Sequence, residues 1–351
     1  MTEGTSGTML LEVVARVRES SNVVSLHLKV VEGTFQPFIA GQYLPLRLNL
    51  PMRPLATYTI SSDPGDHSGY RISVKLDPTG KGGSHFLHSQ APVGTRIAAE
   101  QPRGRFVLPD DHRPVLLLTG GIGITPALSM LSVLARQPGR PAYFIHACRN
   151  ADEHTFAAEI TDMLKHAPHI KVVVAYAEAC PDDISHGRCQ IVGLLDRAAL
   201  RKMLPLDHYH VLLCGPDGFM SAMRHALVGL GMQGQDIHQE SFGGTLPIPA
   251  VHSPKINASQ HADAARAGIV VRFQKSGKDV IWDSANGSLL ELAEAHGLTP
   301  AFECRAGICG TCMCRIMHGT VTYTEDLIDS PKAGHVFMCC AVPDGPITLD
   351  V

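Results

Sequence analysis

The chain has 351 residues, of which 44% are hydrophobic and 18% are charged, with a formal net charge of −3 at pH 7. This length is too great for one ordinary domain, so we expect two or three domains with real cores. The small net charge argues against nucleic acid and against an anionic membrane surface as partners. No apolar signal segment opens the chain, and its cysteines are thinly spread or clustered at ligand spacing, so we expect a cytoplasmic location.

Residues 8–110 show the alternation of half-buried β-strands. Apolar and polar residues alternate over 24–30, 44–50 and 70–76, and turn residues separate these runs. Pro45 has no backbone NH, which suits an edge strand. Several such strands with turns between them predict an antiparallel β-barrel as the first domain.

Residues 111–243 change their period. Four short apolar runs alternate with helical patterns in this segment. Such alternation predicts a parallel, doubly wound α/β domain. Thr125, followed by Pro126, predicts a helix N-cap, and Gly231 is placed to end a later helix.

One part of this segment resembles a membrane span in length. Residues 114–135 hold no charge over 22 positions, which is enough to cross a bilayer. Glycines and Pro126 lie in the middle of the run. A strand, a glycine turn and a helix therefore explain it better than a membrane span does.

The glycine turn inside this run suits a phosphate ligand. Gly120, Gly121 and Gly123 stand between a buried strand and the start of a helix. Backbone NH groups at a helix N-terminus attract phosphate, and missing side chains let a pyrophosphate approach. Cys214 and Gly215 follow the last apolar run, at the sheet edge where ligands bind, although a buried thiol is an equally good explanation of Cys214.

The end of the chain has a different composition. Residues 244–268 are rich in proline, serine and small residues without apolar periodicity, which is typical of a linker. Residues 269–351 then resume strand-like runs, with a short helix that Ser288 is placed to cap. We expect a small mixed α/β domain here.

Four cysteines in this last domain carry the strongest signal in the sequence. They are Cys304, Cys309, Cys312 and Cys339. Their C-x4-C-x2-C…C spacing is that of a plant-type 2Fe–2S cluster, for which four thiolates must converge on one small volume. A zinc site usually shows paired C-x2-C or histidine pairs, which this segment lacks. Cys314 and Cys340 are extra thiols beside the set, and either is a candidate spare ligand in a Cys339→Ala variant.

Several motifs resemble those of the ferredoxin–NADP reductase superfamily, in the same order along nearly the whole chain. Residues 58–62 resemble its R-x-Y-[ST]-x-x-S flavin motif, and residues 80–88 resemble its second flavin motif. The turns at 120–126 and 214–216, together with residues 240–243, resemble its nicotinamide-binding half. The resemblance implies a multidomain protein with an antiparallel flavin barrel, a doubly wound nicotinamide domain and a β-grasp ferredoxin domain. Phthalate dioxygenase reductase has this arrangement, and the reductase core is similar to that of flavohaemoglobins.

The resemblance also implies roles for residues in the flavin domain. The implied flavin-binding residues are Arg53, Tyr58, Thr59, Ser61, Gly82, Gly83 and Ser84. Among them, Thr59 would offer its hydroxyl to flavin N5. Ala56 stands where the motif has arginine, so Arg53, three residues earlier, is the candidate to take the place of that arginine at the flavin phosphate. The flavohaemoglobin-like barrel favours FAD over FMN.

Further roles follow for the nicotinamide and the cluster. The dinucleotide would be held by Gly120, Gly121, Gly123, Thr125, Cys214 and Gly215. Glu240 would line the nicotinamide with Cys214, and Phe242 would lie near the flavin. Thr59, Cys214 and Glu240 are therefore the candidate catalytic residues. The four cysteines match the cluster ligands.

We expect NADH rather than NADPH as the electron donor. The 2′-phosphate of NADPH needs a cationic site, and Arg149 follows the second apolar run of the α/β domain, where that phosphate would lie. Asp152 and Glu153 stand close by in the sequence and would repel it.

Together these features predict an electron-transfer oxidoreductase. Electrons would pass from NADH through FAD to the 2Fe–2S cluster and on to a protein acceptor such as an oxygenase, because the cofactors do the difficult chemistry. The alternatives are a self-contained NAD(P)H-dependent flavin or ferric reductase and a reductase of hybrid-cluster protein. An iron–sulfur redox sensor without turnover is a hypothesis from another class.

Overall fold

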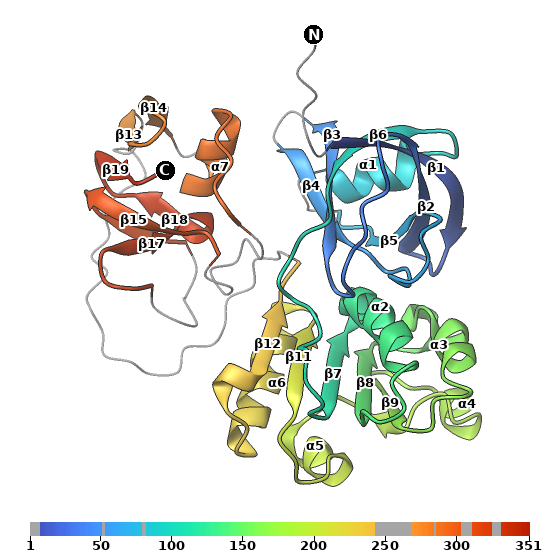
Figure 1. The fold of residues 1–351 in the computed structure, drawn as a ribbon. Coiled ribbons are helices and arrows are strands. Elements are labelled where there is room, and N and C mark those ends of the chain that lie inside the picture. The colour runs from blue at the N-terminus through green and yellow to red at the C-terminus, as the bar shows by residue number, and fades with distance from the viewer. Residues whose placement is uncertain are drawn as a thin grey trace. The chain divides into compact units, whose positions relative to one another are not determined.

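The computed structural model describes residues 8–50, 53–78, 82–242, 268–283, 286–302, 311–324 and 331–351. The chain forms two compact units, Met1–Gln239 and Glu240–Val351, and we describe each by itself. Figure 1 shows a barrel and an α/β layer in the first unit and a small sheet with one helix in the second. Apart from Gly268, the predicted linker 244–268 lies outside the described residues.

The first six strands form one antiparallel sheet in the order β4-β3-β6-β1-β2-β5. An isolated antiparallel bridge between Ile60 and Ile72 joins the end of β4 to β5 and closes the sheet into a barrel. Alternate side chains fill its interior, as the alternating sequence predicts, and Leu26, Leu44 and Leu46 are fully buried. The strands are β1 (Thr8–Arg18), β2 (Val23–Glu32), β3 (Tyr43–Leu50), β4 (Arg53–Thr59), β5 (Tyr70–Lys75) and β6 (Arg96–Glu100).

The expectation of an edge strand at Pro45 is wrong. Strand β3 lies inside the sheet, between β4 and β6. Its ladder with β6 covers only the pairs Leu46↔Ala99 and Arg47↔Ala98. Pro45 lies just outside that ladder, so an internal strand tolerates its missing NH.

The second part of this unit is a six-stranded sheet in the order β10-β9-β8-β7-β11-β12. The four pairings from β10 to β11 are all parallel. The central strands are buried runs, as parallel sheets require. The strands are β7 (Val115–Gly120), β8 (Ala142–Cys148), β9 (Ile170–Tyr176), β10 (Ile191–Val192), β11 (His210–Cys214) and β12 (Ile237–Glu240).

Helices cover both faces of this sheet (Figure 1), which confirms the doubly wound prediction. One core packs α2 and α3 against the sheet, and a second core packs α5 and α6 against the opposite face. The uncharged run 114–135 therefore becomes β7, a glycine turn and α2. No helix in the described part of the chain is long and apolar enough to span a membrane. The helices are α2 (Ile124–Leu134), α3 (Ala157–Met163), α4 (Pro181–Ser185), α5 (Arg197–Met203) and α6 (Asp217–Gly229).

Helix α6 ends where the sequence predicts. Gly231 has a φ of +94°, its NH donates to the carbonyl of Val228, and the NH of Met232 donates to that of Leu227. This pair of bonds is a Schellman motif, for which glycine has the suitable backbone conformation.

The second unit contains a five-stranded sheet in the order β14-β13-β19-β15-β17 and a two-stranded sheet of β16 and β18. Helix α7 (Leu289–Ala295) packs on the core, and Ser288 and Glu291 form the capping box that begins it. This mixed fold is the predicted ferredoxin-like domain. Its strands are β13 (Ile269–Phe273), β14 (Lys278–Trp282), β15 (Met313–His318), β16 (Val321–Tyr323), β17 (His335–Phe337), β18 (Ala341–Pro343) and β19 (Ile347–Leu349).

Candidate functional site

The two predicted flavin motifs meet where β4 faces α1 (Gly83–Ser89). A Cβ atom on Gly83 would lie 2.6 Å from the Tyr58 hydroxyl and 3.5 Å from the Cβ atom of Ala56. Gly82 precedes the helix with a φ of +90°, a conformation that L side chains rarely adopt. Glycine at position 83 lets the tyrosine approach the start of α1, and Gly82 supplies the left-handed backbone that precedes the helix. The structure therefore places Tyr58 against Gly83, with Gly82 next to them in the chain.

Ala56, which stands where the first flavin motif has arginine, lies in a buried contact. Ala56 is only 2% exposed and packs against Gly83. A guanidinium at this position would have to fit into the contact between β4 and α1. Arg53 lies at the start of β4, and its side chain lies outside the described residues.

The remaining flavin candidates are placed around the same strand. Thr59 ends β4 and is buried. The hydroxyl of Ser61 lies 2.8 Å from that of Ser73, which lies 2.8 Å from that of Ser25. The hydroxyl of Ser84 accepts a hydrogen bond from the NH of Asp77 at 3.1 Å. Ser61 thus belongs to a buried hydroxyl chain, whereas Ser84 braces the loop that leads to α1.

The two glycine turns of the α/β layer pack directly on each other at the carboxyl ends of β7 and β11. A Cβ atom on Gly123 would lie 2.3 Å from the Cys214 carbonyl oxygen and 2.7 Å from the Gly215 nitrogen. A Cβ atom on Gly215 would lie 3.0 Å from the Gly120 nitrogen. Gly121 differs, because its φ is +51° and a Cβ atom there would meet nothing within 4 Å. Gly123 and Gly215 are therefore required by the packing of one turn on the other, a Cβ atom on Gly120 would lie 2.9 Å from the Phe219 ring of α6, and only Gly121 presents an open side.

The predicted N-cap at Thr125 is wrong. Residues Gly121–Gly123 form a 3-10 turn that continues directly into α2, so the N-cap residue is Gly123. Thr125 lies in the first helical turn, where its hydroxyl donates to the carbonyl of Ile122 at 3.1 Å. It is 2% exposed. Its side chain therefore stabilises the turn.

A neutral histidine supports the strand below the glycine turn. His146 Nδ1 lies 2.8 Å from the hydroxyl of Thr119, the residue before Gly120. Burial lowers the pKa of His146 to about 3 and that of His154, whose ring stacks on it, to about 4. Both rings are uncharged near neutral pH, so His146 supports the strand that carries the turn without adding a cation there.

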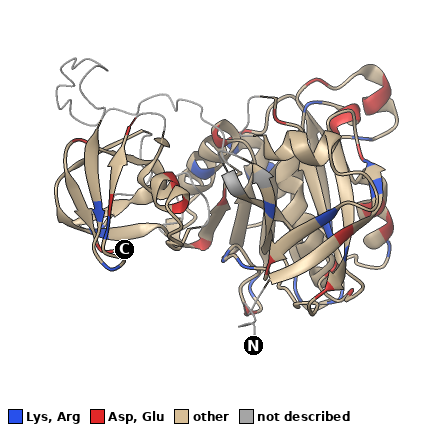
Figure 2. Cartoon of the chain, turned by 90° about the horizontal axis from the view of Figure 1, so that it is seen from above, with Lys and Arg blue, Asp and Glu red and all other residues tan. Residues whose placement is uncertain are grey.

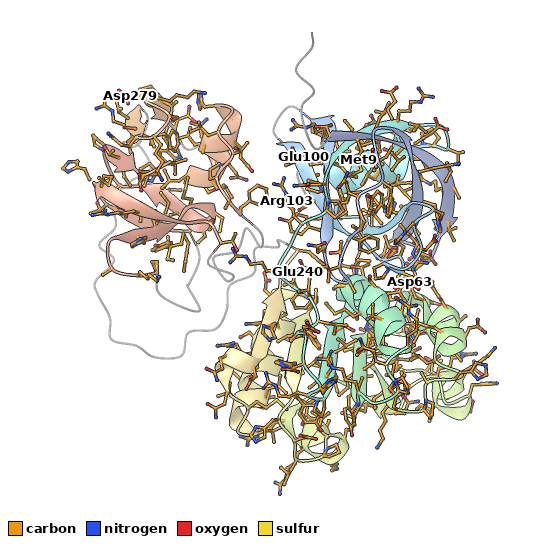
Figure 3. The ribbon with its side chains drawn as sticks, viewed as in Figure 1. Met9, Asp63, Glu100, Arg103, Glu240 and Asp279 are labelled. Carbon is orange, nitrogen blue, oxygen red and sulfur yellow. The ribbon has the colours of Figure 1, made fainter. Side chains whose placement is uncertain are left out.

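The candidate nicotinamide residues lie at the ends of neighbouring strands. Cys214 is the last residue of β11 and is 1% exposed. Glu240 is the last residue of β12, the strand beside β11, and Figure 3 shows it at the tip of that strand. Phe242 follows two residues later and is 43% exposed. Strand ends at one edge of a parallel sheet are the usual place for a ligand.

An arginine that the sequence did not single out links the flavin motif to the α/β layer. The Arg71 guanidinium donates to Glu159 through two bonds of 3.0 and 2.9 Å and to the Ser61 carbonyl at 2.6 Å. It also lies 5.5 Å from the ring centroid of Phe156. Phe156 has a φ of +63°, the only positive value at a non-glycine residue in the described part of the chain. Only tertiary structure brings these residues together, so no local signal would have found them.

A second bidentate pair joins the same two layers. Arg136, two residues after the end of α2, donates to Asp63 at 2.6 and 2.7 Å, and Figure 3 shows Asp63 where the barrel meets α2. The hydrogen bonds that Asp63 accepts from Arg136 lower the pKa of the Asp63 carboxyl. A cavity of about 340 Å³ lies between the two pairs.

Replacing Arg71 is expected to destabilise the first unit more than replacing Arg136. The Arg71 side chain is 13% exposed and that of Arg136 is 55% exposed. Arg71→Met should lower the free energy of unfolding by about 2 kcal/mol, because it leaves the Ser61 carbonyl and Glu159 without their donor. Arg136→Met should cost less than about 1 kcal/mol. Denaturant unfolding of the flavin-loaded variants tests this, and equal losses would contradict it.

Two of the four predicted cluster ligands converge in the second unit. The Cys312 and Cys339 sulfurs lie 3.2 Å apart, and both residues are buried in the same core. Since a disulfide bond is about 2.05 Å long, this pair is not one. Two thiols that converge in an apolar core match the soft ligands of an iron–sulfur cluster. Cys304 and Cys309 lie in the segment 303–310, outside the described residues.

The two extra thiols point to backbone carbonyls. The Cys314 sulfur donates to the Arg315 carbonyl at 3.4 Å, and the Cys340 sulfur donates to the Phe337 carbonyl at 3.6 Å. Both residues are buried. Each thiol therefore has a local acceptor, which accounts for its burial without a ligand role.

Charges of both signs are interspersed along the described chain (Figure 2), as the small net charge leads one to expect. A nucleic-acid-binding surface usually gathers lysine and arginine on one face.

Comparison with known families assigns a domain type to each of the three parts. Residues 10–108 match the family "Oxidoreductase FAD-binding domain" and residues 117–225 match "Oxidoreductase NAD-binding domain". Residues 273–344 match "2Fe-2S iron-sulfur cluster binding domain". These matches define an oxidoreductase with FAD-binding, NAD-binding and 2Fe–2S domains.

Individual relatives agree with this assignment. The flavohemoprotein of Oceanobacillus iheyensis is 34% identical over 70% of this chain and 61% of its own length. The flavohem-like FAD/NAD-binding domain of nitric oxide dioxygenase from Vibrio cholerae is 30% identical over 68% of this chain and all of that domain, with a TM-score of 0.60. The structure of phthalate dioxygenase reductase aligns over 100% of this chain and 100% of its own, at 23% identity and with a TM-score of 0.69.

The chain belongs to the ferredoxin–NADP reductase superfamily, in the branch whose FAD- and NAD-binding core resembles that of flavohemoproteins. It adds the 2Fe–2S domain and has the fold of phthalate dioxygenase reductase. The chain spans about 61% of the length of the Oceanobacillus flavohemoprotein.

Proposed function

We propose that this protein oxidises NADH and delivers the electrons singly to a protein acceptor, such as an oxygenase, through FAD and a 2Fe–2S cluster. The observation that carries the proposal is the buried pair of cysteine sulfurs 3.2 Å apart, on the same chain as the FAD-binding and NAD-binding domains. The bound flavin supplies two-electron acceptance with one-electron release, and the cluster supplies one-electron transfer.

The barrel residues would hold the flavin. Tyr58 and Thr59 lie at the end of β4, next to the start of α1 at Gly83. We assign the flavin ring to Tyr58, with Thr59 as its hydroxyl partner, and the flavin phosphates to the segment around Gly82, Gly83 and Ser84. Arg53 and Ser61 complete the candidate set.

The carboxyl edge of the parallel sheet would hold the nicotinamide dinucleotide. Gly121 has the open side that an approaching pyrophosphate needs. Gly123 and Gly215 keep the two turns close enough to share one ligand, Gly120 leaves room for the Phe219 ring, and Thr125 braces the turn. Cys214, Glu240 and Phe242 are the candidates for contact with the nicotinamide and flavin rings. We assign the cluster to Cys304, Cys309, Cys312 and Cys339.

We also propose the domain limits 8–110, 111–243 and 269–351, with 244–268 as a linker, and a location in the cytoplasm. The family matches at 10–108, 117–225 and 273–344 support the domain limits. The location is supported by the cysteines, because no described cysteine is in a disulfide and thiols persist in a reducing compartment.

Anaerobic titration of the purified protein with NADH tests the proposal. We expect both flavin and cluster absorbance to bleach and a rhombic 2Fe–2S signal to appear by electron paramagnetic resonance. If the flavin bleaches while the cluster stays oxidised even with an acceptor protein present, the protein is a self-contained flavin reductase. If NADH changes neither chromophore, the proposal is wrong.

A further inference from the structure

Arg149 lies at the strand end where dinucleotide-binding sheets usually bind the adenosine ribose. It directly follows β8, the strand beside β7, whose end carries the glycine turn. In such sheets a carboxylate near this point binds the 2′-hydroxyl of NADH, whereas an arginine accommodates the 2′-phosphate of NADPH. An exposed arginine alone at this place would therefore favour NADPH.

The guanidinium of Arg149 is not alone. Its Nε atom lies 3.7 Å from a carboxylate oxygen of Glu153 and 3.9 Å from one of Glu178. The two carboxylates come from separate loops, Glu153 from the turn after β8 and Glu178 from the loop after β9. They approach the arginine from two parts of the chain.

Backbone bonds hold these loops together. The NH of Glu178 donates to the carbonyl of Arg149 at 2.7 Å, and the NH of Ala177 donates to that of Cys148 at 3.0 Å. Asn150 caps the turn by accepting a hydrogen bond from the NH of Glu153 at 3.3 Å. The main chain therefore fixes both glutamates near Arg149.

The local charge balance is negative. Lys75 lies 3.6 Å from the second oxygen of Glu153, and Asp152 is exposed beside it. The ion pairs thus set two cations against two carboxylates, and Asp152, the residue before Glu153, adds a third carboxylate on the exposed turn. A phosphate monoester carries a charge of about −1.5 to −2 at neutral pH, so these carboxylates repel the 2′-phosphate of NADPH. A ribose hydroxyl, by contrast, can donate a hydrogen bond to a carboxylate.

We propose that Glu153 and Glu178 select NADH by neutralising Arg149, which would otherwise bind the 2′-phosphate of NADPH. This inference rests on the proposed function and adds the residues that set its nucleotide specificity. The side chains of Arg149 and Glu178 are 62% and 69% exposed, and that of Glu153 is 27% exposed. Such pairs contribute little to stability, so their removal should leave the fold intact.

The test compares Glu153→Gln, Glu178→Gln and the double variant with wild type, all loaded with FAD. We expect the double variant to gain about tenfold or more in kcat/KM for NADPH while that for NADH changes much less. Calorimetry gives a second readout: adenosine 2′,5′-bisphosphate should bind more tightly by a similar factor, whereas 5′-AMP, which lacks the 2′-phosphate, should not. Adding Arg149→Met to the double variant should abolish the gain.

Asp162→Asn is the matched control. Asp162 is an exposed carboxylate of α3 that pairs with Lys165 at 2.6 Å, so its variant removes a surface charge elsewhere and should leave the specificity ratio unchanged. A wild-type preference for NADPH, or an unchanged ratio in the double variant, would overturn the inference. If neither nucleotide reduces the flavin, the proposed function itself fails, and this outcome is distinct from reduction by NADH with an unmoved ratio.

Discussion

Replacing Cys312 or Cys339 with alanine is expected to remove the iron–sulfur cluster and leave the flavin in place. A plant-type 2Fe–2S cluster uses four thiolates, and these two buried sulfurs already lie 3.2 Å apart. Iron and acid-labile sulfide per flavin should fall below about a tenth of the wild-type values, because a cluster with a missing ligand is not retained. Reduction of the flavin by NADH should persist, since the FAD- and NAD-binding families match other parts of the chain.

The measurements are metal and sulfide analysis, visible absorption and electron paramagnetic resonance of each reduced variant. Cys314→Ala and Cys340→Ala are the matched controls, because both thiols are buried in the same core but donate to backbone carbonyls. Each control should keep a full cluster. A full cluster in Cys312→Ala would contradict the ligand assignment. A cluster in Cys339→Ala that disappears in the Cys339→Ala/Cys340→Ala variant would identify Cys340 as a spare ligand.

Local sequence patterns predicted the architecture because each domain has a period of its own. The alternation around Leu26 and Leu44 gave barrel strands, since every second side chain enters the interior. The Ser288 capping box and the Gly231 helix end were also predictable, because both depend on a few consecutive residues. The spacing of the four cysteines indicated the 2Fe–2S cluster, and motif resemblance then assigned the flavin and the nicotinamide dinucleotide.

The errors came from contacts that the local pattern does not contain. Thr125 and Pro126 look like a helix start, but the 3-10 turn of Gly121–Gly123 runs into α2 and moves the N-cap to Gly123. Pro45 looks like an edge residue, but it lies in an internal strand at a point beyond the ladder with β6. In each case the neighbouring segment decides the outcome.

The arrangement of the site depends on longer-range contacts still. Arg71 and Glu159 are 88 positions apart, and the glycine turns at Gly123 and Gly215 come from different strands. A glycine in a strand–helix turn is compatible with a phosphate ligand, with backbone packing or with a special φ value. Only the structure separates these causes, which act at different glycines of the same turn.

Replacing Gly123 with alanine is expected to disrupt the nicotinamide site. The new Cβ atom would lie 2.3 Å from the Cys214 carbonyl oxygen and 2.7 Å from the Gly215 nitrogen. Both are backbone atoms, so no side chain can rotate away, and the turns after β7 and β11 would have to separate. We expect a loss of about 3 kcal/mol in the free energy of unfolding, together with loss of flavin reduction by NADH. The backbone of Gly123 has a φ of −60°, which alanine adopts readily, so the cost is steric.

Two further glycines provide controls with different causes. Gly121→Ala meets open space but must adopt a φ of +51°, so it should cost about 1–2 kcal/mol of backbone strain. It should also raise the KM for NADH if the pyrophosphate approaches that open side. Gly218 lies in α6 with nothing near its Cβ position, so Gly218→Ala should be neutral or stabilising by about 0.5–1 kcal/mol.

Denaturant unfolding and anaerobic flavin reduction by NADH, measured on all three variants, separate these causes. Gly123→Ala should be the least stable, followed by Gly121→Ala and then Gly218→Ala. If Gly121→Ala lost more stability than Gly123→Ala, backbone strain would matter more in this turn than the close approach of Cys214. If Gly123→Ala kept wild-type stability, the two turns would have room to separate, and their contact would not determine the geometry of the nucleotide site.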